Sequence, residues 1–332
     1  MSQAIGVAPF DAAAATYDAT FTETRLGRWL RDAVHAHLAA LFPPGSRVLE
    51  LGCGTGEDAV WLAQQEVNVV ATDASTRMVE IARQKAAHAG VGDTISLGVL
   101  RIEDLGRAIS EGEAGPKSPS RPVIASEAKQ SPALAADGLD HYGAALARRE
   151  AASSSYCPPR SDSAHCVPGH LDLLQPASFD GALSNFGALN CVADLVPVAH
   201  ALARLVRPGG RVALVLMGRW CPWEIVWHAA HGDLTTAARR LRPGGTSAQV
   251  GGETFRVHYP VPDQIAAAFA PFFTPLELRG IGVLLPPTSL SAIVERHPAA
   301  FERLARWETR IAPTWLAGRL NDHYLLELRR TE

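Results

Sequence analysis

The stretch RVLELGCGTGEDAVWLAQQ, residues 47–65, decides the fold class of this chain. Its first part, RVLELG, is a short apolar run typical of a buried strand, and GEDAVWLAQQ has the spacing of an amphipathic helix. A second pair follows directly, with NVVATD at residues 68–73 as the strand and STRMVEIARQKAAHAG at residues 75–90 as the helix. Two strand–helix units in succession predict a parallel sheet that is covered by helices.

The rest of the chain extends this pattern on both sides. Apolar residues recur at three and four positions over residues 24–42, which predicts an amphipathic helix that ends before Pro43 and Pro44. Five further runs have the character of strands: TISLGVL (94–100), FDGALSN (179–185), RVALVLM (211–217), LRGIGVLL (278–285) and HYLLELRR (323–330). The sequence therefore predicts an α/β fold with an open, doubly wound, mostly parallel sheet of seven strands and an antiparallel edge.

Residues 110–169 depart from the pattern. They are rich in Ser, Ala, Pro and Gly and lack sustained periodicity, which predicts a disordered or loosely held insertion whose removal leaves ligand binding intact. We therefore divide the chain into an N-terminal helical cap (1–44), a main domain (45–109 and 170–332) and this insertion. Within the main domain, residues 218–262 are a candidate lid over a ligand.

Composition narrows the class of protein. The 332 residues are 47% hydrophobic and 20% charged, and the net charge of -3 favours no general attraction to nucleic acid, so a small-molecule substrate is expected. No signal peptide and no apolar run of about 18 residues is evident, so we expect a cytoplasmic protein without a membrane span. The five cysteines form no CxxC pair, which favours neither a disulfide framework nor a metal site.

Three glycines, Gly52, Gly54 and Gly56, lie between the first strand and its helix, where they let the backbone approach a ligand closely. Asp73 ends the next strand, where a carboxylate can accept hydrogen bonds from both ribose hydroxyls. Loop and acid together predict an adenosine-type cofactor. The GxGxG spacing differs from the GxGxxG of dinucleotide sites. The acid Glu50 beside the loop disfavours a pyrophosphate. A carboxylate there instead suits a ligand with an ammonium or sulfonium group, such as S-adenosylmethionine.

These motifs resemble those of a known family. VLELGCGTG and VVATDAS resemble the first two motifs of class I S-adenosylmethionine-dependent methyltransferases, FDGALSNFGALN resembles the fourth, and LVRPGGRVALVLMG resembles the turn and fifth strand that follow. The similarity covers residues 9–217 apart from the insertion. The opening FDAAAATYD looks like the start of small-molecule members related to quinone-biosynthesis methyltransferases. The resemblance implies a Rossmann-like fold and S-adenosylmethionine as the cofactor.

The resemblance also implies roles for individual residues. The loop, Gly52 to Gly56 with Cys53 as a small residue in its turn, would wrap the methionine and ribose, and Glu50 would order the amino group directly or through water. Asp73 would hold the ribose hydroxyls. The remaining cofactor contacts would be Ala74, Ser75 and Met78 at the adenine and Asn185 at the methionine end or the acceptor. The family's adenine-contacting acid does not align uniquely, which leaves Glu103 or Asp104 as candidates.

Candidate acceptor residues are less defined. The tryptophans Trp220, Trp223 and Trp227 recur at helical spacing after the fifth strand, where packing on the domain is favoured over lining an acceptor pocket. GETFRVHYP, residues 252–260, fits either a small hairpin over the crevice or a surface excursion. No catalytic residue is assigned. The side chains to test as a general base are His228, His258, Tyr259 and His323.

The reaction implied is in-line transfer of the sulfonium methyl group to an oxygen, nitrogen or carbon of a small, partly apolar acceptor. Two alternatives stay open at this point. The first is a binding protein that retains the cofactor site without turnover, because a cofactor motif indicates binding only. The second is an NAD-dependent oxidoreductase on a similar fold. The sequence does not define the oligomeric state.

Overall fold

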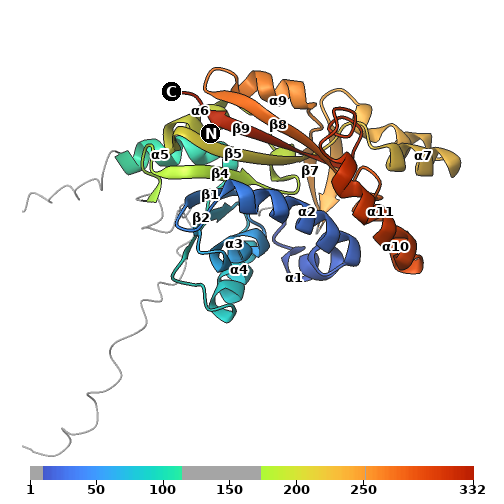
Figure 1. The fold of residues 1–332 in the computed structure, drawn as a ribbon, viewed down its shortest axis with the longest axis horizontal. Helices are drawn as coiled ribbons and strands as arrows, with labels where there is room; N and C mark the ends of the chain where they lie inside the picture. The colour runs from blue at the N-terminus through green and yellow to red at the C-terminus, as the bar shows by residue number, and fades with distance from the viewer. Residues whose placement is uncertain (1–9, 114–172, 251) are drawn as a thin grey trace, which may run out of the picture. The chain divides into compact units, whose positions relative to one another are not determined.

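A computed structural model describes residues 10–113, 173–250 and 252–332, all of which belong to one compact unit (Figure 1). Apart from its first four residues, the predicted insertion lies outside these ranges. Those four belong to helix α5, which runs to Glu113, so the regular structure extends past the predicted boundary at residue 110. None of the helices in the described ranges is long and apolar enough to cross a membrane.

The core is a seven-stranded sheet in the order β3-β2-β1-β4-β5-β9-β8. The strands β1 to β5 are parallel to one another, whereas β9 lies between β5 and β8 and is antiparallel to both. The strand bounds are β1 Arg47–Leu51, β2 Asn68–Asp73, β3 Ile95–Val99, β4 Phe179–Ser184, β5 Val206–Met217, β8 Phe273–Ile281 and β9 His323–Arg330. The predicted α/β fold with a mostly parallel sheet and antiparallel pairing at one edge is confirmed.

Helices cover both faces of the sheet, because alternate residues of each strand point to opposite sides. In β5, Val212, Leu214 and Leu216 pack into one hydrophobic cluster, and Ala213 and Val215 into the other. The first cluster includes residues of α5 (Leu105–Glu113), α6 (Val196–Leu205) and α9 (Pro262–Phe269). The second includes α2 (Arg25–Leu41), α3 (Glu57–Gln64), α4 (Thr76–His88), α10 (Ser291–Arg296) and α11 (Pro298–Ile311). Figure 1 shows these two groups of helices on opposite sides of the sheet.

The helices begin and end where local chemistry dictates. Thr24 caps α2 by accepting a hydrogen bond from the Gly27 amide at 2.9 Å, and the helix ends two residues before Pro43, close to the predicted boundary. Ser75 caps α4 in the same way through the Met78 amide at 3.1 Å. Both helices were predicted at these positions from the spacing of their apolar residues.

The later elements differ from the prediction in their bounds. Strand β5 begins five residues before the predicted RVALVLM, and β8 covers residues 273–281 rather than 278–285. Gly282 ends β8 because its φ of +68° cannot continue a strand. Between the last two strands, the chain forms α10 (Ser291–Arg296) and α11 (Pro298–Ile311), and Pro298 starts the second helix.

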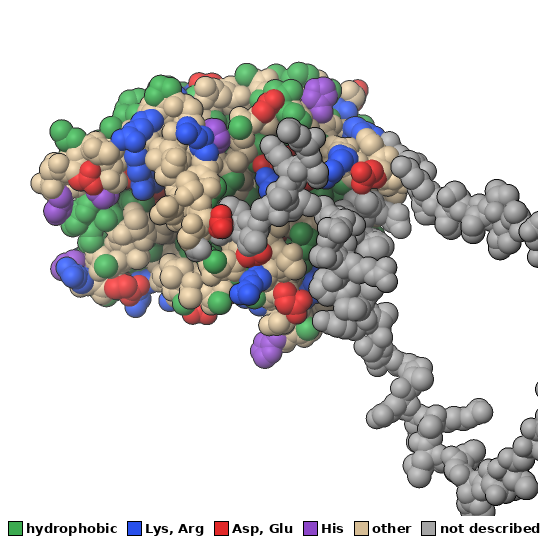
Figure 2. All heavy atoms as spheres, turned by 180° about the vertical axis from the view of Figure 1, so that it is seen from behind, with side chains coloured by type: hydrophobic (Ala, Val, Ile, Leu, Met, Phe, Trp, Pro, Cys, Tyr) green, Lys and Arg blue, Asp and Glu red, His purple; other side chains and the backbone are tan. Residues whose placement is uncertain are grey.

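Two segments lie beside the carboxyl ends of the strands. Near the N-terminus, α1 (Ala14–Tyr17) and the π-helical turn Asp18–Thr22 precede α2. After β5, the chain forms α7 (Pro222–Ala230), α8 (Leu234–Ala237) and the antiparallel hairpin of β6 (Thr246–Val250) and β7 (Glu253–Val257). The predicted hairpin of residues 252–260 is thus shifted: residues 253–257 form its second strand, and the first strand comes before them. From the side opposite to Figure 1, Figure 2 shows acidic and basic side chains mixed over the visible surface.

Candidate functional site

A cavity of 470 Å³ lies at the carboxyl ends of the parallel strands. Gly52 follows β1, Asp73 ends β2, Asn185 follows β4 and Met217 ends β5, and all four line it. The strand order reverses between β1 and β4, and ligands of open α/β sheets bind at such a reversal. The volume suits a small organic molecule.

The glycine loop forms one end of this cavity. The amides of Gly52 and Cys53 donate to the Thr72 carbonyl at 2.8 and 2.9 Å, which ties the loop to the neighbouring strand. Gly52, Gly54 and Gly56 have φ angles of +71°, +54° and +77°, which favour glycine. A Cβ on Gly52 would lie 2.2 Å from the Ala188 Cβ, whereas one on Gly54 would meet nothing within 4 Å. The open space at Gly54 is therefore available to a ligand.

Asp73 is fixed beside the loop by the backbone. Its Oδ2 accepts from the Gly54 amide at 2.9 Å and its Oδ1 from the Ser75 amide at 2.8 Å. Burial raises the pKa of Asp73, and these two backbone bonds partly offset the rise. Each carboxylate oxygen has more than one acceptor site, so the group can also accept from hydroxyls of a bound ligand.

Glu50 is the least satisfied acid near the loop. Its side chain is 1% exposed, and Oε2 has no hydrogen-bond partner among the described residues. Burial raises the pKa of Glu50 well above its usual value, and the nearby charge of Asp58 raises it further. A buried carboxyl group without a partner is costly, and a cation close to it would remove that cost.

A buried polar cluster supports the middle of the cavity. Asp58 accepts from Arg31 Nη1 and lies beside His35 Nε2, both at 2.7 Å, and it accepts from Asn185 Nδ2 at 2.9 Å. Burial favours the neutral acid, but Arg31 and His35 hold the pKa of Asp58 well below its usual value. The cluster therefore fixes the amide of Asn185 at the tip of β4. Arg31 also lies 5.1 Å from the ring centre of Phe186.

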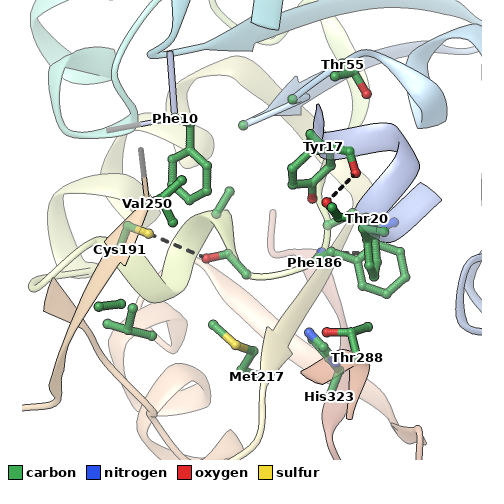
Figure 3. Close-up of a pocket in the computed structure, with 18 of the residues that line it drawn as sticks. Phe10, Tyr17, Thr20, Thr55, Phe186, Cys191, Met217, Val250, Thr288 and His323 are labelled. Atoms are coloured by element: carbon green, nitrogen blue, oxygen red, sulfur yellow. Dashed lines mark hydrogen bonds between the residues drawn. The ribbon is translucent and has the colours of Figure 1, made fainter. Parts of the chain in front are cut away.

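The N-terminal segment closes over the glycine loop. Asp18 accepts from Thr55 Oγ1 at 2.7 Å and pairs with Lys85 at 2.8 Å, while Asp11 bonds the hydroxyl of Ser75. Phe10, Tyr17, Thr20 and Phe21 thereby line the cavity, three of them labelled in Figure 3. Burial raises the pKa of Tyr17 to about 12, so its hydroxyl stays protonated and can donate.

The far end of the cavity has an apolar wall beside a group of charged side chains. Met217 and the hairpin residues Ala248, Val250, Phe255 and Val257 form the apolar wall. The Phe255 ring lies 5.3 Å from that of Phe10, so the hairpin meets the N-terminal segment over the cavity. In Figure 3, Met217, Thr288 and His323 lie at the end opposite to Thr55.

Two arginines at this end are already neutralised. Arg239 donates twice to Glu224 at 2.7 Å, and Arg240 donates to Glu224 at 2.8 Å and to Asp322 Oδ1 at 2.7 Å. Burial opposes the charge of Arg240, but Asp322 and Glu224 raise its pKa. Two positive and two negative groups therefore balance here.

Part of the chain matches a known protein family. Residues 48–111, from β1 to α5, match the profile of a family described as a methyltransferase domain. This chain carries a class I S-adenosylmethionine-dependent methyltransferase domain. Its cofactor is S-adenosylmethionine.

Solved structures share the fold of this methyltransferase domain. A Haemonchus contortus phosphoethanolamine N-methyltransferase 2 in complex with S-adenosyl-L-methionine is 13% identical, with a TM-score of 0.50 over 97% of this chain and 57% of that chain. A chain of the complex between the Haloferax volcanii Trm112 methyltransferase activator and its methyltransferase is 15% identical, with a TM-score of 0.51 over 98% and 100%. At these identities the similarity concerns the fold alone. No curated protein matches this sequence.

The structure brings most of the predicted cofactor residues together. The predicted residues that line the cavity are Gly52, Cys53, Gly54, Asp73, Met78 and Asn185. Glu50, Gly56 and Ala74 do not line it: Gly56 instead packs against Ala82, where a Cβ would lie 2.6 Å away, and Ala74 is exposed. Glu103 and Asp104 also lie off the cavity, paired with Arg101 and Arg107.

Some of the side chains considered for the acceptor end line the cavity, and others do not. Of the four side chains considered as a base, Tyr259 and His323 line the cavity, and His228 and His258 do not. None of the three tryptophans lines it. Trp223 donates to the Leu284 carbonyl at 2.9 Å and packs on Phe301, as the packing interpretation expects, whereas Trp220 is 46% exposed.

Sequence reasoning missed several lining residues. Tyr17 and Phe21 precede the predicted helix, Arg31 lies within it, and Asp58 looks like an ordinary helix N-terminal acid. The FDAAAATYD motif was the available signal for the first of these. Arg31 and Asp58 gave none, because their pairing depends on how α2 packs against α3.

One group of described side chains could in principle hold a metal ion: His37, Glu277 and Glu327. It lies away from the cavity, where α2 crosses β8 and β9. Glu327 is 2.6 Å from Arg211 and 2.8 Å from His37, and Glu277 pairs with Arg279. Cations of the chain therefore already balance these carboxylates, and the group is an ion-pair network between the helix and the sheet.

Proposed function

We propose that the enzyme transfers the methyl group of S-adenosylmethionine to a small, partly apolar acceptor. The observation that carries this proposal is the continuity of the cavity, which extends from the glycine loop at Gly54 to the apolar hairpin residues Val250 and Phe255. A cofactor held at one end presents its methyl group to whatever occupies the other, and alignment of this kind supplies much of the rate of a methyl transfer.

The charges around the loop support the cofactor orientation. Arg31 pairs with Asp58, whereas the described contacts of Asp73 are hydrogen bonds from backbone amides, so the Asp73 carboxylate makes this end of the cavity favour a ligand with a positive charge. In the proposed arrangement Asp73 holds the ribose hydroxyls, and Glu50 faces the amino group directly or through water. Gly52, Cys53 and Gly54 contact the methionine and ribose.

The remaining proposed contacts complete the cofactor site. Met78 and Ala74 border the adenine, and Asn185 faces the methionine end, held in place by Asp58. Gly56 contributes through its turn: its tight packing on Ala82 sets the path of the loop. The sulfur leaves as a neutral thioether after the transfer, so the site's negative charge favours the reactant over the product.

Two segments cover the acceptor in this proposal. The helical cap of residues 1–44 provides Phe10 and Phe21, and residues 218–262 act as the acceptor lid through the hairpin. Both exclude water from the reacting atoms. The FDAAAATYD motif provides Phe10 and Tyr17 of this wall, which supports a place among small-molecule methyltransferases related to quinone-biosynthesis enzymes.

The experiment that tests this function supplies labelled S-adenosylmethionine to the purified protein together with a metabolite extract, bulk tRNA or a protein extract. We expect label in an organic-extractable small molecule. Label in tRNA or protein, with little in the metabolite fraction, would contradict the proposal.

A further inference from the structure

His323 occupies a defined position at the acceptor end of the cavity. It opens β9, lines the cavity and is 6% exposed. Its ring lies edge-on to Phe186, with centroids 5.5 Å apart and planes at 84°. Its Nδ1 lies 3.1 Å from Asp322 Oδ2. One carboxylate and one aromatic side chain thus flank the ring, although the approach of Nδ1 to Oδ2 does not have the geometry of a hydrogen bond.

Asp322 is itself held rigidly. It is buried, and its Oδ1 accepts from Arg240 Nη2 at 2.7 Å. Burial favours the neutral acid, but His323 and Arg240 hold the pKa of Asp322 well below its usual value. A charged carboxylate beside Nδ1 favours a proton there, which leaves Nε2 as the acceptor of a second proton.

We propose that His323 is the general base of the methyl transfer and that the acceptor presents a hydroxyl group on an uncharged, apolar skeleton. This inference rests on the proposed function and specifies its acceptor. Within the described lining, the only acid at this end of the cavity is Asp322, and its charge is matched by Arg240. Glu224 in turn matches Arg239. An ammonium or carboxylate acceptor would find no unmatched counter-charge, whereas a hydroxyl group needs a proton acceptor.

The step balances without a further reactant. The acceptor oxygen attacks the methyl carbon, the O–CH3 bond forms, and the S–CH3 bond breaks with its electron pair passing to sulfur. The O–H bond breaks as Nε2 of His323 takes the proton, and the resulting imidazolium is stabilised by Asp322. The products are a methyl ether and S-adenosylhomocysteine.

The test compares two series of probes with the full-length protein. The first is a set of substituted phenols of graded acidity, and the second is the matching N,N-dimethylanilines, which need no proton removal. The variants are His323→Gln and Asp322→Asn. The control is His228→Gln, a helix α7 residue off the cavity that lies 3.8 Å from Asp233.

We expect the wild-type protein to methylate phenols in preference to dimethylanilines. His323→Gln should lower kcat by roughly 100-fold or more for weakly acidic phenols, and the loss should shrink toward unity for phenols already ionised at the assay pH. Asp322→Asn should show the same trend with a smaller loss. S-adenosylmethionine affinity should be unchanged in both variants, and the control should match the wild type.

Three results would overturn the inference. One is an equal loss of kcat for all phenols, because a purely structural role predicts no dependence on acidity. Another is methylation of dimethylanilines but not phenols by the wild-type protein, which decides the matter even if the variants do not fold. The last is S-adenosylmethionine binding with no phenol turnover. Failure to bind S-adenosylmethionine at all would instead reject the proposed function.

Discussion

Replacing Gly54 by alanine should weaken S-adenosylmethionine binding much more than it weakens the fold. Gly54 has a φ of +54° and would place a Cβ where no protein atom lies within 4 Å. The left-handed backbone alone costs an alanine about 1–2 kcal/mol. The added methyl group points into the space proposed for the cofactor, where an overlap of about 1–3 kcal/mol corresponds to roughly 5- to 150-fold weaker binding.

Gly90 provides the matched control. It has a φ of +70°, also has nothing within 4 Å of a Cβ, and does not line the cavity. Gly54→Ala and Gly90→Ala should therefore lower Tm by similar amounts, at roughly 2–4 °C per kcal/mol for a domain of this size. Calorimetric titration with S-adenosylmethionine should separate them, with Gly90→Ala close to the wild type. Equal affinities in the two variants would refute the assignment of Gly54 to the cofactor.

Two further predictions concern stability. Because burial raises the pKa of Glu50 above its value of 4.5 in the unfolded chain, the folded protein keeps this proton after the unfolded chain has lost it, and the free energy of unfolding falls as pH rises from 4.5 through the folded pKa. Denaturant titrations should show a weaker fall in Glu50→Gln, and an identical slope would show that the acid is not buried as described. Trp223→Ala should cost about 2–3 kcal/mol, less than a fully buried tryptophan, while acceptor turnover and S-adenosylmethionine affinity stay the same. A loss of acceptor affinity at unchanged stability would favour the pocket role for Trp223 instead.

The sheet and the cofactor loop could be predicted because their signals are local. Short apolar strands, the three- and four-residue spacing of the helices, and the glycine spacing each act over a few positions. Gly52 and Asp73 meet because consecutive parallel strands place their carboxyl ends side by side. The predicted bounds of β8 were wrong because the residues VLL after Gly282 are as apolar as a strand, and only the backbone turn at Gly282 ends β8.

The wall of the cavity could not be predicted in the same way. Arg31 reaches Asp58 only because α2 packs beside α3. No local sequence pattern links the two residues. Asp322 and Arg240 pair across 82 positions of the chain. The histidines show most clearly what the sequence could not predict. His228, His258 and His323 were equally good candidates for a base in the sequence, but of these three only His323, at the start of β9, lines the cavity.

The measurement that tests the central claim most directly is calorimetric titration of the purified protein with S-adenosylmethionine, S-adenosylhomocysteine and NAD, repeated on Asp73→Ala. The account predicts that the first two ligands bind and NAD does not. It also predicts that Asp73→Ala weakens both by about 2–3 kcal/mol, which corresponds to roughly 30- to 150-fold, because hydrogen bonds from the ribose to a charged carboxylate are lost. Binding of NAD alone, or unchanged S-adenosylmethionine affinity in a folded Asp73→Ala variant, would contradict the account.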